Sequence, residues 1–523
     1  MSWLAAKRYF SFCKRFTYAI QNYDIELDLD PRRRSYKASV SLTLTVKKNT
    51  RQFCFLLSDH CTLHSINYLG LALTHSVKPA YPERNLITAV LPRQADAGER
   101  LVLSFIYSGS VPVHEGKSIE LPPSKYWYPH SPCPQNYTCT LKVITPDLIR
   151  IVASGNFVRE QPADTRTLTQ WSATEPFRGI HILAGDFIKT TRETQPVFDI
   201  YYPRHYMNQG KTVADACEIL LDFFTEKLGP APASSGIVVL TDNPGPETNS
   251  SYFLTSISGG ILEEIKEYIT SRERTMRLFL ICARELAHRW LKYNLTTAHP
   301  RYLWYLDGLA EYLSWLAVEQ EYGKGAREEL MREARSEVLA GPKVSIQSVA
   351  YGVKQDFPRW LVCKGSWILR TAHCLAPDKF LPALADIYTQ CQNAAPAPED
   401  FFLTLGNLTA TDLIQLYKEW VNSDRQLRAE ILAARTFRDD KGHWQLVFNL
   451  VNSGKLAWPH PIDIKMELSD GSSQVQSFAI QREPHLISTP AKIVRLTVDP
   501  EMKLLNWAEN NIRWGSRWMA KLL

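Results

Sequence analysis

The chain has 523 residues, ten of them cysteine, and a formal net charge of +6. This length exceeds what one hydrophobic core usually supports, so we expect about three domains. The charge is mild and no basic run carries interleaved aromatic residues, which argues against nucleic-acid binding. No apolar run approaches the roughly 18 to 20 residues that cross a bilayer.

The cysteines are scattered from Cys13 to Cys391, and none forms a C-x-x-C pair. This pattern is typical neither of a disulfide framework nor of a thiolate zinc site. Reduced thiols in a cytosolic protein are the plain interpretation, so we expect a cytoplasmic location.

The first twenty residues mix aromatic side chains with Lys7, Arg8, Lys14 and Arg15. These charges interrupt any apolar stretch and argue against a secretory signal. An ordered or frayed basic leader is the simpler interpretation. The alternative is an amphipathic helix that makes weak contact with a membrane surface.

Residues 21–198 form a predicted N-terminal β domain. Apolar and polar residues alternate along several segments, which indicates strands with one buried and one solvent-facing side. The spacing and the turn signals predict a large antiparallel sheet or sandwich. The clearest segments are 23–29, 36–46, 101–107 and 137–143.

Residues 199–424 form a predicted, mostly helical domain. Apolar residues between 213 and 228 fall on one helical face, and Gly229-Pro230 ends that helix. A buried strand is expected at 237–240, followed by a loop rich in Pro, Gly and Asn. From residue 278 to residue 423 we expect mainly helices.

Residues 425–523 return to a period of two. The alternation is clearest at 444–450 and 462–468, and turn signals lie at 440–442 and 470–471. This pattern predicts a small C-terminal β-sandwich.

The strongest motif is Arg284-Glu285-Leu286-Ala287-His288. The zinc-protease motif H-E-x-x-H places two His ligands on one helix face and uses the Glu as general base. Here Glu285 and His288 occupy the general-base and second-ligand positions, whereas Arg284 stands where the first His belongs. Taken alone, Glu-x-x-His is usually an ordinary buried ion pair in a helical domain.

A second block follows His288 after eighteen intervening residues and reads Asp307-Gly308-Leu309-Ala310-Glu311-Tyr312. A catalytic zinc needs three protein ligands and an open position, and a carboxylate from a following helix commonly supplies the third. Together the two blocks resemble the zinc aminopeptidase (gluzincin) family typified by membrane alanyl aminopeptidase. That family shows H-E-x-x-H, eighteen residues, and then a Glu inside N-E-G-F-A-E-Y.

The resemblance covers the whole chain, with further similar segments at 126–129, 143–155 and 363–366. It implies an α+β multidomain protein with an N-terminal β domain, a thermolysin-like mostly helical domain and a C-terminal β-sandwich. These are the three domains that the periodicity predicts.

The sequence departs from the family at both ligand blocks. Arg284 cannot ligate zinc, because a guanidinium stays cationic and offers no lone pair. Asp307 keeps an oxygen donor at the position of the family's Glu ligand but is one methylene shorter. Metal–ligand distances tolerate only about 0.2 Å, so the backbone would have to shift.

Two further parts of the family's machinery are also missing. Val362 stands at the position of the transition-state Tyr, two residues before a Lys-Gly pair, and no spacing supports Tyr351 as a substitute. The amine-binding motif G-x-M-E-N should precede Ser256, but residues 249–253 contain no Glu.

We therefore expect a metal-free, salt-bridged site in which Arg284 forks to Asp307 or Glu311 and no cofactor is bound. The protein would be a catalytically inactive member of this fold that binds a peptide or protein partner or acts as a scaffold. The alternative is an active zinc-dependent peptidase in which His288, Asp307 and a further group hold zinc and Glu285 is the base.

Overall fold

The computed structural model describes most of the chain in two compact units. A first unit lies within residues 3–298, and a second unit lies within residues 299–390 and 396–523. Residues 1–16, which make up most of the predicted basic leader, lie outside the described residues, as does Tyr351. The described ranges are 17–80, 83–111, 118–133, 135–146, 148–163, 165–231, 235–245, 248–268, 270–291, 303–350, 358–390, 396–508 and 511–513.

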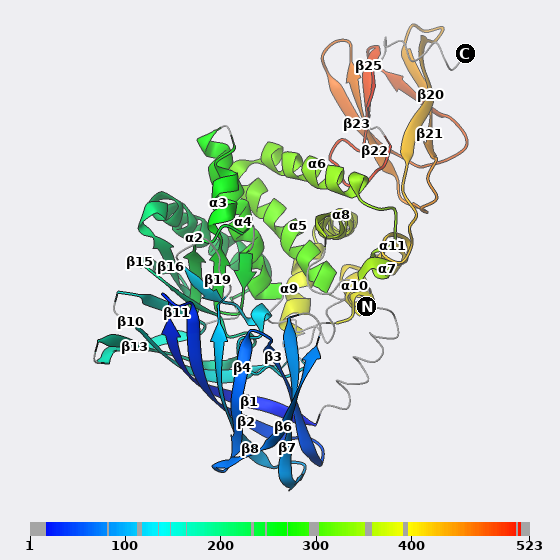
Figure 1. The fold of residues 1–523 in the computed structure, drawn as a ribbon. Helices are drawn as coiled ribbons and strands as arrows, with labels where there is room; N and C mark the ends of the chain where they lie inside the picture. Colours follow the sequence, from blue (N-terminus) through cyan, green and yellow to red (C-terminus); the bar gives the residue numbers. More distant parts are fainter. Residues whose placement is uncertain are drawn as a thin grey trace. The chain divides into compact units, whose positions relative to one another are not determined.

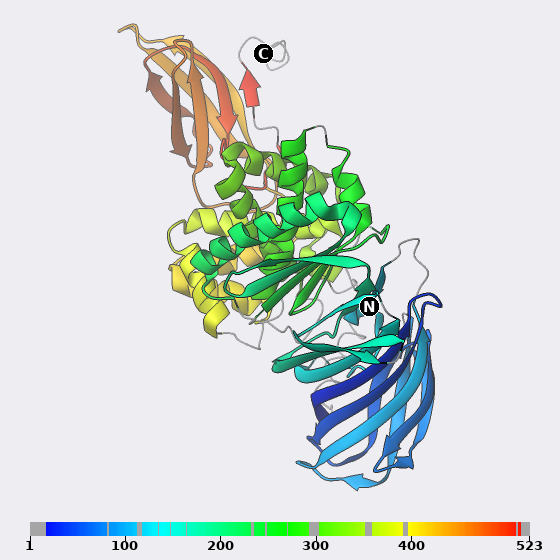
Figure 2. The ribbon, with the colours of Figure 1, turned by 90° about the vertical axis from the view of Figure 1, so that its left-hand side faces the viewer.

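An eight-stranded sheet forms the largest layer of the first unit (Figures 1 and 2). Buried and exposed side chains alternate along its long strands, as the sequence predicts. Its order is β12 (Asn156–Ala163), β13 (Arg166–Phe177), β10 (Tyr137–Pro146), β1 (Tyr18–Asp30), β2 (Ser35–Val46), β8 (Arg100–Ser110), β4 (Cys61–Tyr68) and β5 (Leu71–Ala72).

One pair in this sheet departs from the predicted antiparallel arrangement. Strands β1 and β10 run parallel, with Leu27 opposite Val143. Alternation reports that one face of a strand is buried, but it carries no information about the direction of a neighbouring strand. The prediction is therefore wrong for this pair.

Two three-stranded sheets complete the β structure of the N-terminal region. One has the order β3 (Thr50–Ser58), β7 (Arg84–Ala95) and β6 (Thr74–Ala80). The other has the order β11 (Arg150–Ala153), β14 (Ile182–Gly185) and β9 (Ile119–Leu121).

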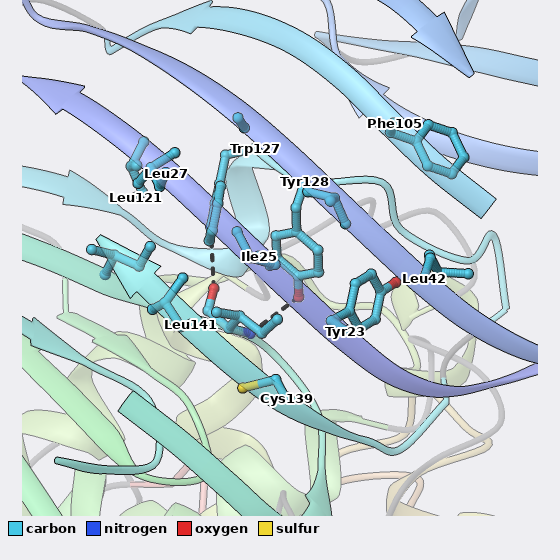
Figure 3. Close-up of a cluster of buried hydrophobic side chains, with 14 of the residues drawn as sticks. Tyr23, Ile25, Leu27, Leu42, Phe105, Leu121, Trp127, Tyr128, Cys139 and Leu141 are labelled. Atoms are coloured by element: carbon cyan, nitrogen blue, oxygen red, sulfur yellow. Dashed lines mark hydrogen bonds between the residues drawn. The ribbon is translucent and has the colours of Figure 1, made fainter. Parts of the chain in front are cut away.

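Trp127 and Tyr128 anchor the core of the first unit (Figure 3). Trp127 Nε1 donates to the carbonyl oxygen of Ile180 at 3.1 Å, and the Ile180 amide donates to Tyr128 Oη at 3.1 Å. Both rings are buried with their polar atoms bonded, as buried aromatic residues require. The 126–129 segment that resembles the zinc aminopeptidase family is therefore a packing element.

A five-stranded sheet adjoins three helices in the first unit. Its order is β15 (Phe187–Arg192), β16 (Val197–Pro203), β17 (Ser235–Leu240), β19 (Leu254–Ile257) and β18 (Thr248–Ser250). The predicted domain boundary at residue 198 falls inside β16. The helices are α2 (Met207–Leu228), α3 (Gly259–Ile265) and α4 (Ser271–Leu291).

The second unit begins with a group of helices (Figure 1). Helices α5 and α8 cross closely, because a Cβ built on Gly308 would lie 3.0 Å from the backbone carbon of Gly365. The helices are α5 (Leu303–Tyr322), α6 (Lys324–Ala340), α7 (Ile346–Ala350), α8 (Arg359–Leu375), α9 (Phe380–Gln390), α10 (Pro398–Thr409) and α11 (Leu413–Trp420).

The C-terminal β-sandwich predicted from the sequence is confirmed. Phe448 and Phe478, from the two sheets, pack edge to face with ring centroids 5.0 Å apart. One sheet has the order β20 (Ala429–Arg438), β21 (Trp444–Asn452) and β24 (His485–Thr489). The other has the order β23 (Ser473–Phe478), β22 (Ile462–Leu468), β25 (Ile493–Val498) and β26 (Asn511–Arg513).

The cysteines differ from the expectation of reduced thiols throughout. Seven described cysteines, including Cys217 and Cys282, are thiols, whereas Cys133 is disulfide-bonded. Disulfides are rare in the cytosol, so the cysteines do not support a cytoplasmic location. Among the helices that the structure describes, none is long and apolar enough to cross a membrane.

Candidate functional site

Helix α4 carries Arg284, Glu285 and His288, the first block of the motif. Glu285 is 5% exposed and His288 is 7% exposed. The two side chains lie three positions apart, so they share one face of the helix. The structure therefore places the predicted general-base and second-ligand side chains together on a buried helix face.

Both carboxylate oxygens of Glu285 accept hydrogen bonds from strand β18. The Thr248 hydroxyl donates to Oε1 at 2.8 Å, and the Ser250 hydroxyl donates to Oε2 at 2.6 Å. Thr248 and Ser250 are two positions apart on a strand, so their side chains point to the same face. Strand β18 thus presents a pair of hydroxyls to the buried carboxylate.

The charge of Glu285 is stabilised inside the protein. Burial acts to raise the pKa of this carboxyl, but nearby Arg284 and His288 and the two hydroxyl donors outweigh burial. The net result is a pKa of Glu285 below its ordinary value. The carboxylate is consequently a weak proton acceptor at neutral pH.

Arg284 lies beside the carboxylate of the residue that follows it. Its Nε is 3.5 Å from Glu285 Oε1, and the Arg284 side chain is 31% exposed. A guanidinium remains charged at every relevant pH, so a zinc dication bound to this turn would meet a fixed positive charge. This stretch of α4 is therefore a poor fit for a catalytic zinc.

The second block lies on helix α5 in the second unit. Glu311 is 1% exposed, and Arg359 from α8 donates two hydrogen bonds of 2.7 Å to its two oxygens. Trp315 Nε1 donates to the same carboxylate at 3.2 Å. Arg359 thus makes a two-pronged bond to Glu311, one of the two carboxylates that the sequence offers as partners for Arg284. The pairing of Arg284 with Asp307 or Glu311 stays a prediction.

The position of the family's transition-state Tyr is on helix α8. Val362 is half-buried there, and its carbonyl oxygen accepts a 2.9 Å hydrogen bond from the Ser366 hydroxyl. The Val362 side chain has no group that could donate to an oxyanion. The next landmark, Gly365, packs against Trp304 of α5, with a distance of 3.2 Å from a built Cβ to the ring.

A second buried carboxylate, Glu120, was missed by the sequence analysis. It is the middle residue of the short strand β9 and accepts hydrogen bonds from His181 Nε2 at 2.9 Å and from Ser256 Oγ at 2.5 Å. The side-chain amides of Asn249 and Asn243 donate to it at 3.1 and 3.3 Å. Burial acts to raise the pKa of Glu120, but these donors, His181 first, hold it below its ordinary value.

Strand β18 separates the two carboxylates. Thr248 and Ser250 bond Glu285, whereas Asn249 between them bonds Glu120. This division follows from the alternation of side chains along a strand. No sequence signal links Glu120 to Asn249, because 129 residues separate them.

Within the ranges that the structure describes, no group of three or more His, Cys, Asp or Glu side chains is arranged to hold a metal ion.

The architecture of the chain is an aminopeptidase-like, multidomain α+β fold. The crystal structure of Legionella pneumophila aminopeptidase A in complex with aspartic acid aligns with it at a TM-score of 0.72 and 12% sequence identity. The alignment covers 94% of this chain and 60% of that one, so this chain spans about 60% of the length of that aminopeptidase. No protein-family model and no curated protein matches the sequence. At this identity the likeness shows the fold alone.

Proposed function

We propose that this chain is an aminopeptidase-like protein that has lost peptidase activity and acts by binding a peptide or a protein partner. The proposal rests on the hydrogen bonds that the Thr248 and Ser250 hydroxyls donate to the Glu285 carboxylate. It concerns the one side chain that the sequence assigns to general-base catalysis.

A general base works best when its pKa lies near the operating pH and when it reaches the proton that it abstracts. Both oxygens of Glu285 already accept hydroxyl donors, and its pKa lies below the ordinary value. A water molecule activated by Glu285 would have to share a carboxylate oxygen with one of these hydroxyl donors. The arrangement supports a structural role for Glu285.

The metal-free part of the proposal rests on Arg284. This guanidinium stands at the first ligand position and lies 3.5 Å from the Glu285 carboxylate, which neutralises charge that a zinc ion would otherwise balance. His288 and Asp307 remain the residues that would hold zinc if the alternative, an active zinc peptidase, is correct. Zinc bound there would act as a Lewis acid and activate water.

Binding of an extended peptide is supported by the position of β18. Among the described strands, β18 pairs with β19 alone and forms the edge of the five-stranded sheet. An edge strand offers backbone donors and acceptors to an incoming extended segment. We therefore propose that the ligand is an extended segment of a substrate-like protein or of a partner protein.

Metal analysis and a hydrolysis assay test the proposal together. We expect the full chain, purified without added metal, to contain far less than one zinc per molecule and to leave aminoacyl fluorogenic substrates uncleaved. The control is the Glu285→Gln variant, which should give the same background rate. One tightly bound zinc per chain, with hydrolysis that Glu285→Gln abolishes, would establish the active zinc peptidase instead.

Membrane association is a separate proposal that concerns residues 1–20. Basic and aromatic side chains in this segment suit weak binding to an anionic membrane surface. Sedimentation with anionic liposomes, compared between the full chain and a variant lacking these residues, tests it. Equal sedimentation of the two proteins would contradict it.

A further inference from the structure

Three turns at one end of the N-terminal β domain lie side by side. The Ala97 amide donates a hydrogen bond of 2.9 Å to the side chain of Asn49, and Arg93 Nη2 donates to Tyr68 Oη at 3.3 Å. The turns join β2 to β3, β4 to β5 and β7 to β8. We call this end of the domain the basic rim, and it comprises residues 47–51, 67–74 and 91–100.

Positive charge is in excess on the basic rim. Its three segments contain five basic and two acidic residues, which leaves a net charge of +3. One of the basic residues, Arg93, forms an ion pair with Glu99. All five basic side chains are exposed, and they are Lys47, Lys48, Arg51, Arg93 and Arg100.

Two exposed leucines stand at the tip of the same rim. Leu69 is 81% exposed and Leu71 is 66% exposed. In the turn between β4 and β5, Leu69 has a φ of 51° and Gly70 a φ of 79°. Such turns favour Asn-Gly or Asp-Gly, because both central residues need a positive φ. A large apolar side chain is unfavourable there for the fold itself, which indicates a role in contact with an apolar partner.

Exposed apolar side chains among basic ones match the surface of an anionic membrane. Lys and Arg are attracted to anionic headgroups, and the leucines can enter the apolar boundary below them. Single-stranded nucleic acid fits less well, because its binding relies on stacking against aromatic rings. Tyr68 is the one aromatic residue of the three segments, and it is buried.

The basic leader is a poor alternative occupant of the rim. It carries Lys7, Arg8, Lys14 and Arg15 and no acidic residue in positions 1–16. Like charges repel, so the leader and the rim are not complementary. An anionic surface complements both.

We propose that the basic rim docks on an anionic lipid bilayer, with Leu69 and Leu71 inserted among the headgroups and the basic side chains at the membrane surface. The proposal goes beyond the membrane association proposed for residues 1–20, because it assigns the contact to folded residues. It is independent of peptide binding and of the loss of catalysis.

Sedimentation of the full chain with lipid vesicles tests the proposal. Vesicles of phosphatidylcholine and phosphatidylserine in equal amounts are compared with vesicles of phosphatidylcholine alone. We expect the chain to bind the anionic vesicles at least about tenfold more tightly, and binding should weaken as salt shortens the range of the attraction. Absence of binding to the anionic vesicles, or equal binding to both kinds, would overturn the proposal.

A variant of the two leucines locates the inserted tip. Leu69→Asn/Leu71→Thr removes the apolar side chains, and the variant should fold because Asn suits the turn and Thr suits a strand. Affinity for the anionic vesicles should fall at least about tenfold. An unchanged affinity would overturn the assignment.

Leu148→Asn is the matched control for the leucine variant. Leu148 is 94% exposed and has a φ of 72°, but it follows β10 at the opposite end of the sheet. We expect this substitution to change the vesicle affinity by less than about twofold, because Leu148 lies outside the proposed contact. A fall as large as that of the leucine variant would overturn the proposal.

A pair of charge variants separates the rim from the overall charge of the chain. Lys47→Gln/Arg100→Gln removes two exposed charges of the rim, each expected to contribute about fivefold near an anionic surface, so affinity should fall about 25-fold. Arg32→Gln/Arg33→Gln changes the net charge equally at the opposite end of the sheet and should lower affinity less than about threefold. Equal losses in the two variants would overturn the role of the rim.

Deletion of residues 1–16 distinguishes the rim from the leader. We expect the deletion variant to keep binding the anionic vesicles, because the rim is intact. Loss of binding on deletion, with no effect of the two rim variants in the full chain, would assign the contact to the leader and overturn the rim. Binding of single-stranded DNA without binding of vesicles would overturn it in favour of a nucleic-acid surface.

Discussion

The Ser250 hydroxyl donates a 2.6 Å hydrogen bond to the carboxylate of Glu285, and so joins strand β18 to helix α4. On the opposite face of the same strand, Asn249 donates to Glu120 at 3.1 Å. A three-residue strand thus donates hydrogen bonds to two largely buried carboxylates. Substitutions in this strand should therefore act on the stability of the fold.

Replacing Ser250 by Ala removes one donor from a buried carboxylate. Hydrogen bonds to charged groups contribute about 1.5 to 3 kcal/mol, so we expect the free energy of unfolding to fall by about 2 kcal/mol. Urea denaturation measures this change. Ser336→Ala, at an exposed position of α6, is the control and should stay within about 0.5 kcal/mol.

The two buried carboxylates should make the protein sensitive to acid. The pKa values of Glu120 and Glu285 are lowered in the folded chain, so the unfolded chain binds more protons as the pH falls through about 4.3. Their contribution to stability is complete above that pH and is lost as the pH falls through the folded-state pKa values.

Urea denaturation between pH 7 and about 3.5 checks this expectation. The double variant Glu120→Gln/Glu285→Gln should be less stable at pH 7 and should lose less stability on acidification. Glu264→Gln, exposed on α3, should follow the unsubstituted chain. Equal pH slopes for the double variant and the unsubstituted chain would refute the assigned role of the two carboxylates.

Removing only one partner of the Arg359–Glu311 pair should destabilise the folded protein. Arg359→Met leaves the buried Glu311 without its two-pronged partner, and because the Arg359 side chain is 46% exposed we expect the free energy of unfolding to fall by about 1.5 to 3 kcal/mol. The double variant Arg359→Met/Glu311→Leu removes both charges and should recover most of that loss. Arg332→Ala, which removes an exposed guanidinium 3.6 Å from Glu328, should cost less than about 1 kcal/mol. A loss in the double variant equal to that in Arg359→Met would show that packing, not charge, dominates.

Gly308 should not tolerate a side chain. A Cβ there would lie 3.0 Å from the backbone of Gly365, and backbone cannot move aside cheaply. We expect Gly308→Ala to lower stability by about 1 to 3 kcal/mol, measured as a fall in Tm. Gly325→Ala on α6, where nothing lies within 4 Å, should be neutral or stabilising by up to about 1 kcal/mol.

Arg284→His restores the H-E-x-x-H pattern and should raise the affinity of α4 for zinc without restoring hydrolysis. Val362 still has no group that donates to the oxyanion, and loss of such a donor lowers kcat by about 10²- to 10³-fold. Glu285 also remains hydrogen-bonded to β18. Zinc content and aminoacyl substrate turnover are measured on the same preparation. Turnover well above background would show that the loss of the Tyr and of the amine-binding Glu matters less than we argue.

Periodicity in the sequence predicted the main elements correctly. Strands β1, β2, β8 and β10 contain the four segments of period two, and α2 covers the predicted helical face that ends before Gly229. These patterns are local, because each reflects which side of one element faces the core. The parallel pairing of β1 with β10 was not predictable, since those strands lie more than 100 residues apart.

The motif likewise identified α4 and the positions of Glu285 and His288 from the sequence alone. Only the tertiary structure showed that Thr248 and Ser250 donate hydrogen bonds to the Glu285 carboxylate and that Arg359 donates hydrogen bonds to Glu311. These partners lie 35 to 48 residues away along the chain, where no spacing rule applies. The sequence determined which residue types stand at each helix and strand position, whereas the fold decided which charges meet, because burial forces each buried carboxylate to find donors wherever the chain brings them.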